Sequence, residues 1–95
     1  MNNSFIEQRF NMSANMVNNL NSNVSDDELL NLYALYKQAK FGNCNIEEPT
    51  GFLFNAKECL KWKAWNKKTG MSKTDAMTKY SDYVMDLINK YGLKN

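Results

Sequence analysis

Apolar residues recur at intervals of three and four along most of this chain of 95 residues, and alternation of apolar and polar residues is nowhere sustained. Such spacing is typical of amphipathic α-helices, because residues three and four apart lie on one face of a helix. The sequence therefore predicts an all-α fold. The predicted helices cover about residues 4–20, 26–40, 54–68 and 72–91.

Local start and stop signals limit these helices. Ser25 is followed three residues later by Glu28, which is the pattern of a capping box, and Ser72 is followed in the same way by Asp75. Gly70 can adopt the left-handed conformation that ends many helices. Because about three residues join the last two helices, we expect these helices to lie antiparallel as neighbours.

The length of the chain allows one domain with one core, so we assign residues 1–95 to a single domain. No apolar run is long enough to span a bilayer, and the first residues lack the basic-then-apolar order of a signal peptide. Cys44 and Cys59 do not form a spaced metal motif. We interpret them as two free thiols in a reducing compartment, which fits a cytoplasmic protein. A single disulfide is the alternative.

The sequence contains no histidine. That absence removes the commonest general base and the usual partner of a nucleophilic serine or cysteine. The sequence also lacks a glycine-rich phosphate loop and a cluster of metal-ligating residues. We therefore expect a protein that is not an enzyme and that uses no cofactor and no metal.

Basic residues are concentrated in residues 57–79, which contain seven lysines against Glu58 and Asp75. Such a distribution suits an anionic ligand, whether a phosphate, a nucleic acid or a membrane surface, although a solvated helix face has the same appearance. The net charge of +2 and the single arginine argue against nucleic acid.

The helix at residues 26–40 carries more apolar surface than one packing face requires. Either it is central and buried all round, or one side lines a ligand groove. Tyr33, Tyr36 and Lys37 lie side by side on it at helical spacing. Spacing alone leaves a core role and a binding role equally open for these residues.

The helix at residues 54–68 places Lys57 and Lys61 one turn apart, where two ammonium groups could hold a phosphate between them. Trp62 and Trp65 follow at a spacing of three. We interpret this tryptophan pair as the core anchor of the helix rather than a stacking platform.

Four blocks of sequence carry a family resemblance: LYALYKQA at 32–39, GNCN at 42–45, KWKAWN at 61–66 and GMSK at 70–73. In order and register, from about residue 10 to residue 92, the chain resembles the acyl-CoA-binding proteins. The resemblance implies an up-down-down-up four-helix bundle, which agrees with the four predicted helices. It also implies an intracellular carrier that binds medium- and long-chain acyl-CoA esters in lipid metabolism.

The resemblance further implies the residues of a binding site, with Lys37 and Lys61 converging on the ribose 3′-phosphate. The implied contacts with the coenzyme A nucleotide and phosphate are Tyr33, Tyr36, Lys37, Lys57, Lys61 and Tyr80. The implied acyl-chain groove consists of Leu29 and Leu30, facing Ala14.

The implied partners are acyl-CoA esters, and transient contact with a membrane or an acyl-CoA-using enzyme is compatible with a monomeric carrier. The alternative is a helical protein-interaction or nucleic-acid-binding module that has lost the ligand. One departure from the family concerns Ser81, which occupies a packing position that is usually apolar. We expect a cost in stability there, or a local compensation.

Overall fold

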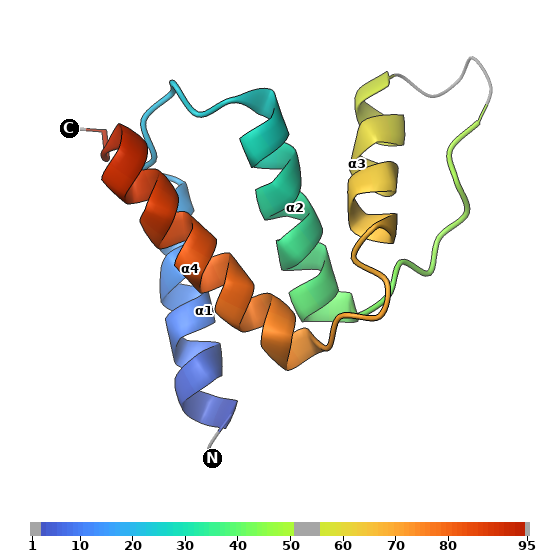
Figure 1. Ribbon diagram of the computed structural model, residues 1–95, viewed down its shortest axis with the longest axis horizontal. Helices are drawn as coiled ribbons and strands as arrows, with labels where there is room; N and C mark the ends of the chain where they lie inside the picture. The colour runs from blue at the N-terminus through green and yellow to red at the C-terminus, as the bar shows by residue number, and fades with distance from the viewer. Residues whose placement is uncertain (1–2, 51–55, 95) are drawn as a thin grey trace.

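The computed structural model describes residues 3–50 and 56–94, and the regular structure in them consists of four helices. The helices run up, down, down and up, which confirms the predicted all-α four-helix fold (Figure 1). Their bounds are α1 Asn3–Val17, α2 Asp26–Phe41, α3 Ala56–Asn66 and α4 Lys73–Tyr91. Among the described residues, none of these helices combines the length and the apolar content needed to cross a membrane.

Helix α2 is the central element of the packing. It contacts α3 on one side and α4 on the other, while α4 also packs along α1 (Figure 1). The expectation that α3 and α4 are neighbours is wrong, because the described part of α3 contacts only α2 among the helices. The side chain of Trp65 explains this arrangement, since its Nε1 donates a hydrogen bond of 2.9 Å to the carbonyl of Gly42 and fixes α3 to the end of α2.

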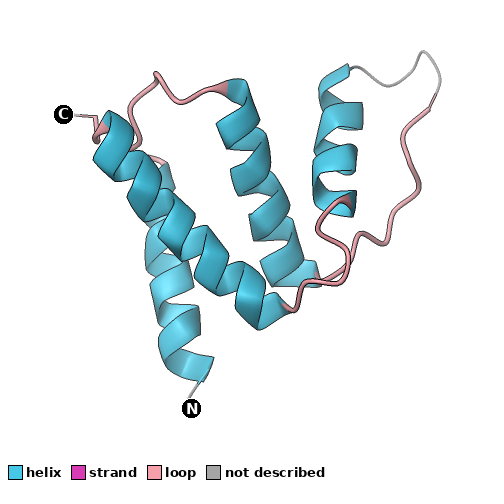
Figure 2. Ribbon diagram, viewed as in Figure 1, coloured by secondary structure: helices cyan, strands magenta, loops and turns pink. Residues whose placement is uncertain are grey.

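Helix α1 ends at Val17, three residues before the predicted end. Asparagine favours turns over helix interiors. The N–H of Asn19 donates a hydrogen bond of 2.9 Å to the carbonyl of Met16, which closes a tight turn. Leu20 then forms an isolated antiparallel bridge with Leu93, so the chain leaves α1 to pair with the segment after α4. Figure 2 draws the segments that follow α1 and α4 as loops.

The predicted caps of α2 and α4 are present. Ser25 Oγ accepts a hydrogen bond from the N–H of Glu28 at 3.2 Å, and Glu28 Oε1 accepts one from the N–H of Ser25 at 3.0 Å. Ser72 Oγ accepts a hydrogen bond from the N–H of Asp75 at 3.0 Å, which is one half of the second box. Gly70 has the positive φ of 98° expected for a left-handed residue.

The last residues predicted for the third helix are not helical. Helix α3 ends at Asn66, and residues 67–70 form a turn. The N–H of Lys68 bonds the carbonyl of Trp65, three residues back, so the helical hydrogen-bond pattern tightens and stops there. The predicted first residues of this helix, 54 and 55, lie outside the described residues.

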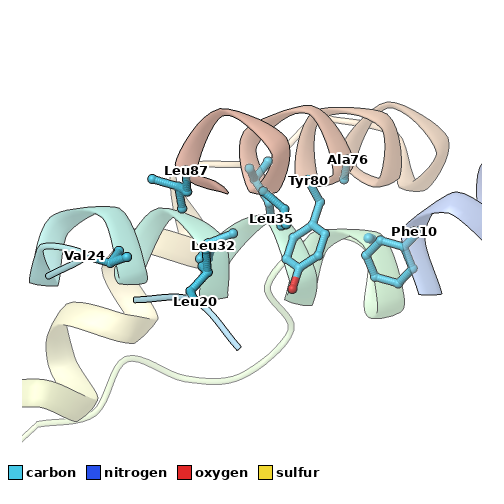
Figure 3. Packing of buried hydrophobic residues seen from close by; sticks show 10 residues of the cluster. Phe10, Leu20, Val24, Leu32, Leu35, Ala76, Tyr80 and Leu87 are labelled. Atoms are coloured by element: carbon cyan, nitrogen blue, oxygen red, sulfur yellow. The ribbon is translucent and has the colours of Figure 1, made fainter. Parts of the chain in front are cut away.

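The hydrophobic core joins α1, α2 and α4 (Figure 3). Phe10 is 2% exposed and reaches α2 with its ring, whose centroid lies 5.6 Å from that of Tyr36. Ser81 of α4 is also buried, and its Oγ donates a hydrogen bond of 3.0 Å to the carbonyl of Met77. This bond is the local compensation expected at that position, since a buried hydroxyl is costly only without a partner.

A buried amide fixes the end of α2 to the turn before α4. Gln38 is fully buried, and its Nε2 donates hydrogen bonds to Asn43 Oδ1 at 2.9 Å and to the carbonyl of Met71 at 2.8 Å. Asn43 Oδ1 also accepts the N–H of Gly70 at 2.9 Å. The end of α2 and the residues just after it are thereby joined to residues 70–71, which are distant in the sequence.

Candidate ligand-binding site

A cavity of about 470 Å³ lies between the first half of α2 and the described part of α3. Its walls contain five of the residues that the sequence analysis assigned to a ligand, together with two that it did not. The lining residues are Asp26, Leu29, Leu30 and Tyr33 from α2, and Lys57, Leu60 and Lys61 from α3.

The broad apolar surface of α2 is buried in the core in one part of the helix and lines the cavity in another. Each of the two interpretations of this helix therefore holds for one part of it. Its later residues are buried, including Leu35 and Ala39 in the core against α4. Its earlier residues open onto the cavity, where Leu29 is 46% exposed. Leu60 of α3 lines the same cavity and is 50% exposed. These side chains form an apolar wall that solvent can reach.

Two ammonium groups lie near the ring of Tyr33. Lys37 Nζ, one turn further along α2, is 5.8 Å from the ring centroid. Lys61 Nζ, from α3, is 5.0 Å from the same centroid. Two positive charges from different helices therefore meet at one aromatic ring, at the border of the cavity. The two lysines that the resemblance assigns to the ribose 3′-phosphate thus lie near one ring, and their role toward a ligand stays a prediction.

Burial raises the pKa of the hydroxyl groups of Tyr33 and Tyr80. It is the main cause that raises the pKa of Tyr33, and the proximity of Glu58 and Cys44 raises this pKa further. Burial, with a smaller effect of Tyr36, raises the pKa of Tyr80 to about 12. Both hydroxyl groups therefore stay protonated at neutral pH and remain able to donate a hydrogen bond.

Four of the assigned residues do not line the cavity, namely Lys37, Tyr36, Tyr80 and Ala14. Tyr80 belongs to the core, where it is 4% exposed and its ring centroid lies 5.9 Å from that of Tyr36. Tyr36 is half-buried, and its ring packs against those of Phe10 and Tyr80. Ala14 packs against the core from α1 and is not among the residues around Leu29 and Leu30. The ligand roles of all the assigned residues, those that line the cavity included, stay predictions.

The tryptophan pair divides into two functions. Trp65 is buried, as expected for a core anchor. Trp62 is half-buried, and its Nε1 donates a hydrogen bond of 2.8 Å to the carbonyl of Ile46, which fastens the long connection between α2 and α3 to the helix. Cys44 and Cys59 both lie in this region as free thiols.

Three residues at the site escaped the sequence analysis, namely Asp26, Leu60 and Phe41. Asp26 lines the cavity at the start of α2. Leu60 immediately precedes Lys61, and its spacing of three from Lys57 could have indicated the shared face. Phe41 is 54% exposed, and its ring centroid lies 4.6 Å from Lys37 Nζ. Its spacing of four from Lys37 was the available signal.

An apolar cavity bordered by lysines from two helices suits a ligand that is both apolar and anionic. The fold and the cavity thus define a small helical binding protein for amphipathic anions. The family described as "Acyl CoA binding protein" matches residues 7–84. The chain belongs to the acyl-CoA-binding protein family.

Relatives of known name agree over nearly the whole length. The chain is 45% identical over 86 residues to "Acyl-CoA-binding protein 2" of Saccharomyces pastorianus, covering 90% of this chain and 97% of that protein. It is equally similar, with the same coverage, to "Acyl-CoA-binding protein" of Saccharomyces cerevisiae.

Solved structures support the same family. The crystal structure of Oryza sativa acyl-CoA-binding protein 2 has a TM-score of 0.84 at 34% identity, covering 90% of this chain and 92% of that one. The solution structure of the acyl coenzyme A binding protein from yeast has a TM-score of 0.67 at 46% identity, covering 87% of this chain and 94% of that one.

Proposed function

We propose that this chain binds medium- and long-chain acyl-CoA esters with high affinity and acts as an intracellular carrier and pool former in lipid metabolism. One observation carries the proposal. The ammonium groups of Lys37 and Lys61 lie 5.8 Å and 5.0 Å from the ring centroid of Tyr33, beside an apolar cavity of about 470 Å³. An acyl-CoA ester has the matching chemistry, since a long apolar chain is joined to a nucleotide that carries phosphates.

The two ends of the ligand contribute differently in this proposal. Lys37 and Lys61 donate charge-assisted hydrogen bonds to the ribose 3′-phosphate, with Lys57 nearby at the headgroup, and these contacts give specificity. The tyrosines contact the adenine nucleotide. The acyl chain lies against Leu29 and Leu30, where each methylene removed from water contributes up to about 0.8 kcal/mol. The chain thus supplies much of the affinity.

The protein carries out no chemical step on its ligand in this proposal, and it needs neither cofactor nor metal. The absence of histidine from the sequence supports this view, because the commonest general base is missing. We propose a cytoplasmic monomer that exchanges its ligand through transient contacts with a membrane or with enzymes that use acyl-CoA.

A titration of the protein with palmitoyl-CoA and, separately, with a short single-stranded oligonucleotide tests the proposal. Isothermal calorimetry should show saturable binding of one palmitoyl-CoA and no binding of the oligonucleotide. Binding of the oligonucleotide alone would favour the alternative of a nucleic-acid-binding module. Absence of both would favour a protein-interaction module that has lost the ligand.

A further inference from the structure

The ammonium group of Lys37 lies against three aromatic rings. Its Nζ is 4.6 Å from the ring centroid of Phe41, 5.1 Å from that of Trp65 and 5.8 Å from that of Tyr33. Contacts of this length are within the range of cation–π attraction, and more than one ring acts on the same charge. Phe41 contributes the shortest of the three distances.

Two of the three rings pack against each other at the end of α2. Trp65 is buried and bonded to the carbonyl of Gly42, the residue after Phe41. The ring of Phe41 packs against that of Trp65, with centroids 6.3 Å apart and planes at 53°. Lys37, in contrast, has a flexible four-carbon stem, and a free lysine side chain loses much rotamer freedom when a ligand immobilises it.

The exposure of Phe41 has no explanation in the core. Its side chain is 54% exposed and does not belong to the buried cluster. Because the ring stays half in water, hydrophobic burial stabilises it only in part. Its observed contacts are those with Lys37 and Trp65.

We propose that Phe41 is a positioning residue that holds the Lys37 ammonium toward the ligand and thereby strengthens the preference for a ligand with a phosphate at that place. This inference rests on the proposed function, because it requires Lys37 to bind the phosphate of an acyl-CoA ester. Holding the side chain before binding reduces the entropy that the ligand must offset. Removing the ring should cost affinity only for a ligand that uses Lys37.

The test compares palmitoyl-CoA with its 3′-dephospho form, using calorimetry on the full chain. Phe41→Leu should bind palmitoyl-CoA about threefold to tenfold more weakly than the wild type, as expected for one lysine side chain that is no longer held in place. Its affinity for the dephospho ester should be unchanged. Phe41→Tyr keeps the ring and should restore the preference. Phe5→Leu makes the same substitution at a phenylalanine that is 68% exposed on α1, and it should alter neither affinity.

A second readout needs no ligand. In the wild type, ring currents should shift the ε-methylene protons of Lys37 upfield in the NMR spectrum, and Phe41→Leu should reverse much of this shift without lowering the melting temperature. Unchanged ε-methylene shifts in Phe41→Leu would overturn the inference. Equal losses for both esters would also overturn it, because the ring would then contact the ligand directly. If the wild type bound neither ester, the proposed function itself would be refuted. If the wild type bound both esters and Phe41→Leu changed neither affinity, only the positioning role would be refuted.

Discussion

Glu28 and Tyr91 join the beginning of α2 to the end of α4, through a hydrogen bond of 2.6 Å from the tyrosine hydroxyl to Glu28 Oε1. The same carboxylate accepts the N–H of Ser25 at 3.0 Å, and its second oxygen lies 3.1 Å from Lys90 Nζ. The hydrogen bond from Tyr91 is the largest of the effects that lower the pKa of Glu28 to about 2. One side chain thus caps its own helix and holds the last turn of another.

We expect this carboxylate to stabilise the fold at neutral pH and to lose that effect in acid. The pKa of Glu28 is about 2 in the folded protein and near 4.5 in an unfolded chain, so the unfolded chain binds the proton first as the pH falls. The contribution is complete above about pH 4.5 and disappears as the pH falls through about 2. The midpoint of urea unfolding, measured along this pH range, should show the loss.

Two variants isolate the contribution of Glu28 to acid sensitivity. Glu28→Gln should be less stable than the wild type at neutral pH, and the difference between the two should shrink toward pH 2. Tyr91→Phe removes only the hydroxyl donor and should give an intermediate result. A constant difference between Glu28→Gln and the wild type at every pH would contradict the role given to the carboxylate.

Removal of either paired lysine should weaken binding without unfolding the protein. We expect Lys37→Ala and Lys61→Ala each to cost about 1.5–3 kcal/mol in the free energy of acyl-CoA binding, as for the loss of a charged hydrogen bond. Lys40→Ala, at an exposed position one turn from the site, is the matched control. Calorimetry with palmitoyl-CoA measures the effect. The phosphate role would be wrong if the wild type bound the dephospho ester as tightly as the full ester.

The position of α1 can be tested by its buried phenylalanine. Phe10 is 2% exposed in the core, so Phe10→Ala should lower the free energy of unfolding by about 3–5 kcal/mol. Phe5, on the same helix, is 68% exposed, and Phe5→Ala should change it by no more than about 0.5 kcal/mol. Urea unfolding of the two variants gives both values. Similar losses at the two positions would show that α1 is wrongly oriented.

The last prediction concerns the acyl chain and tests the apolar wall separately from the headgroup contacts. Affinity should rise from free coenzyme A through medium-chain esters and then level off, because the cavity has a finite length. The gain per methylene should stay below about 0.8 kcal/mol, since a wall open to solvent dehydrates the chain incompletely. Calorimetry over esters of increasing chain length measures this rise.

A polar substitution in the wall should affect only the acyl chain. Leu29→Asn should reduce the rise with chain length and leave the binding of free coenzyme A nearly unchanged. Met85→Asn, at an apolar residue of α4 that is 48% exposed and does not line this cavity, should leave the whole series as in the wild type. If the wild-type series showed no dependence on chain length, the cavity would not be the acyl site.

The features predicted well from sequence are those held by contacts between residues close in the chain. Ser25 and Glu28 are three residues apart, and their reciprocal hydrogen bonds fix the start of α2 wherever the helix lies. The left-handed Gly70 follows the same principle, because its missing Cβ gives it conformational freedom that other residues lack. The end of α1 was predicted less well, since Leu20 leaves the helix to pair with Leu93, a partner distant in the sequence.

The sequence by itself therefore determined four helices, most of their limits and, through motifs shared with a family, the residues expected to contact a ligand. Only the tertiary structure decided that α3 packs on α2 and not on α4. The short connection between α3 and α4 keeps the end of one helix near the start of the other, but it does not fix the angle between the two helices. The tertiary structure likewise decided that Lys37 and Lys61 meet at Tyr33, whereas Tyr80 lies in the core. The exposed ring of Phe41 lies beside Lys37 for the same reason, since it packs against Trp65, which is bonded to the end of α2. Hydrogen bonds within one turn of a helix are encoded locally, while meetings between helices depend on how the whole chain packs.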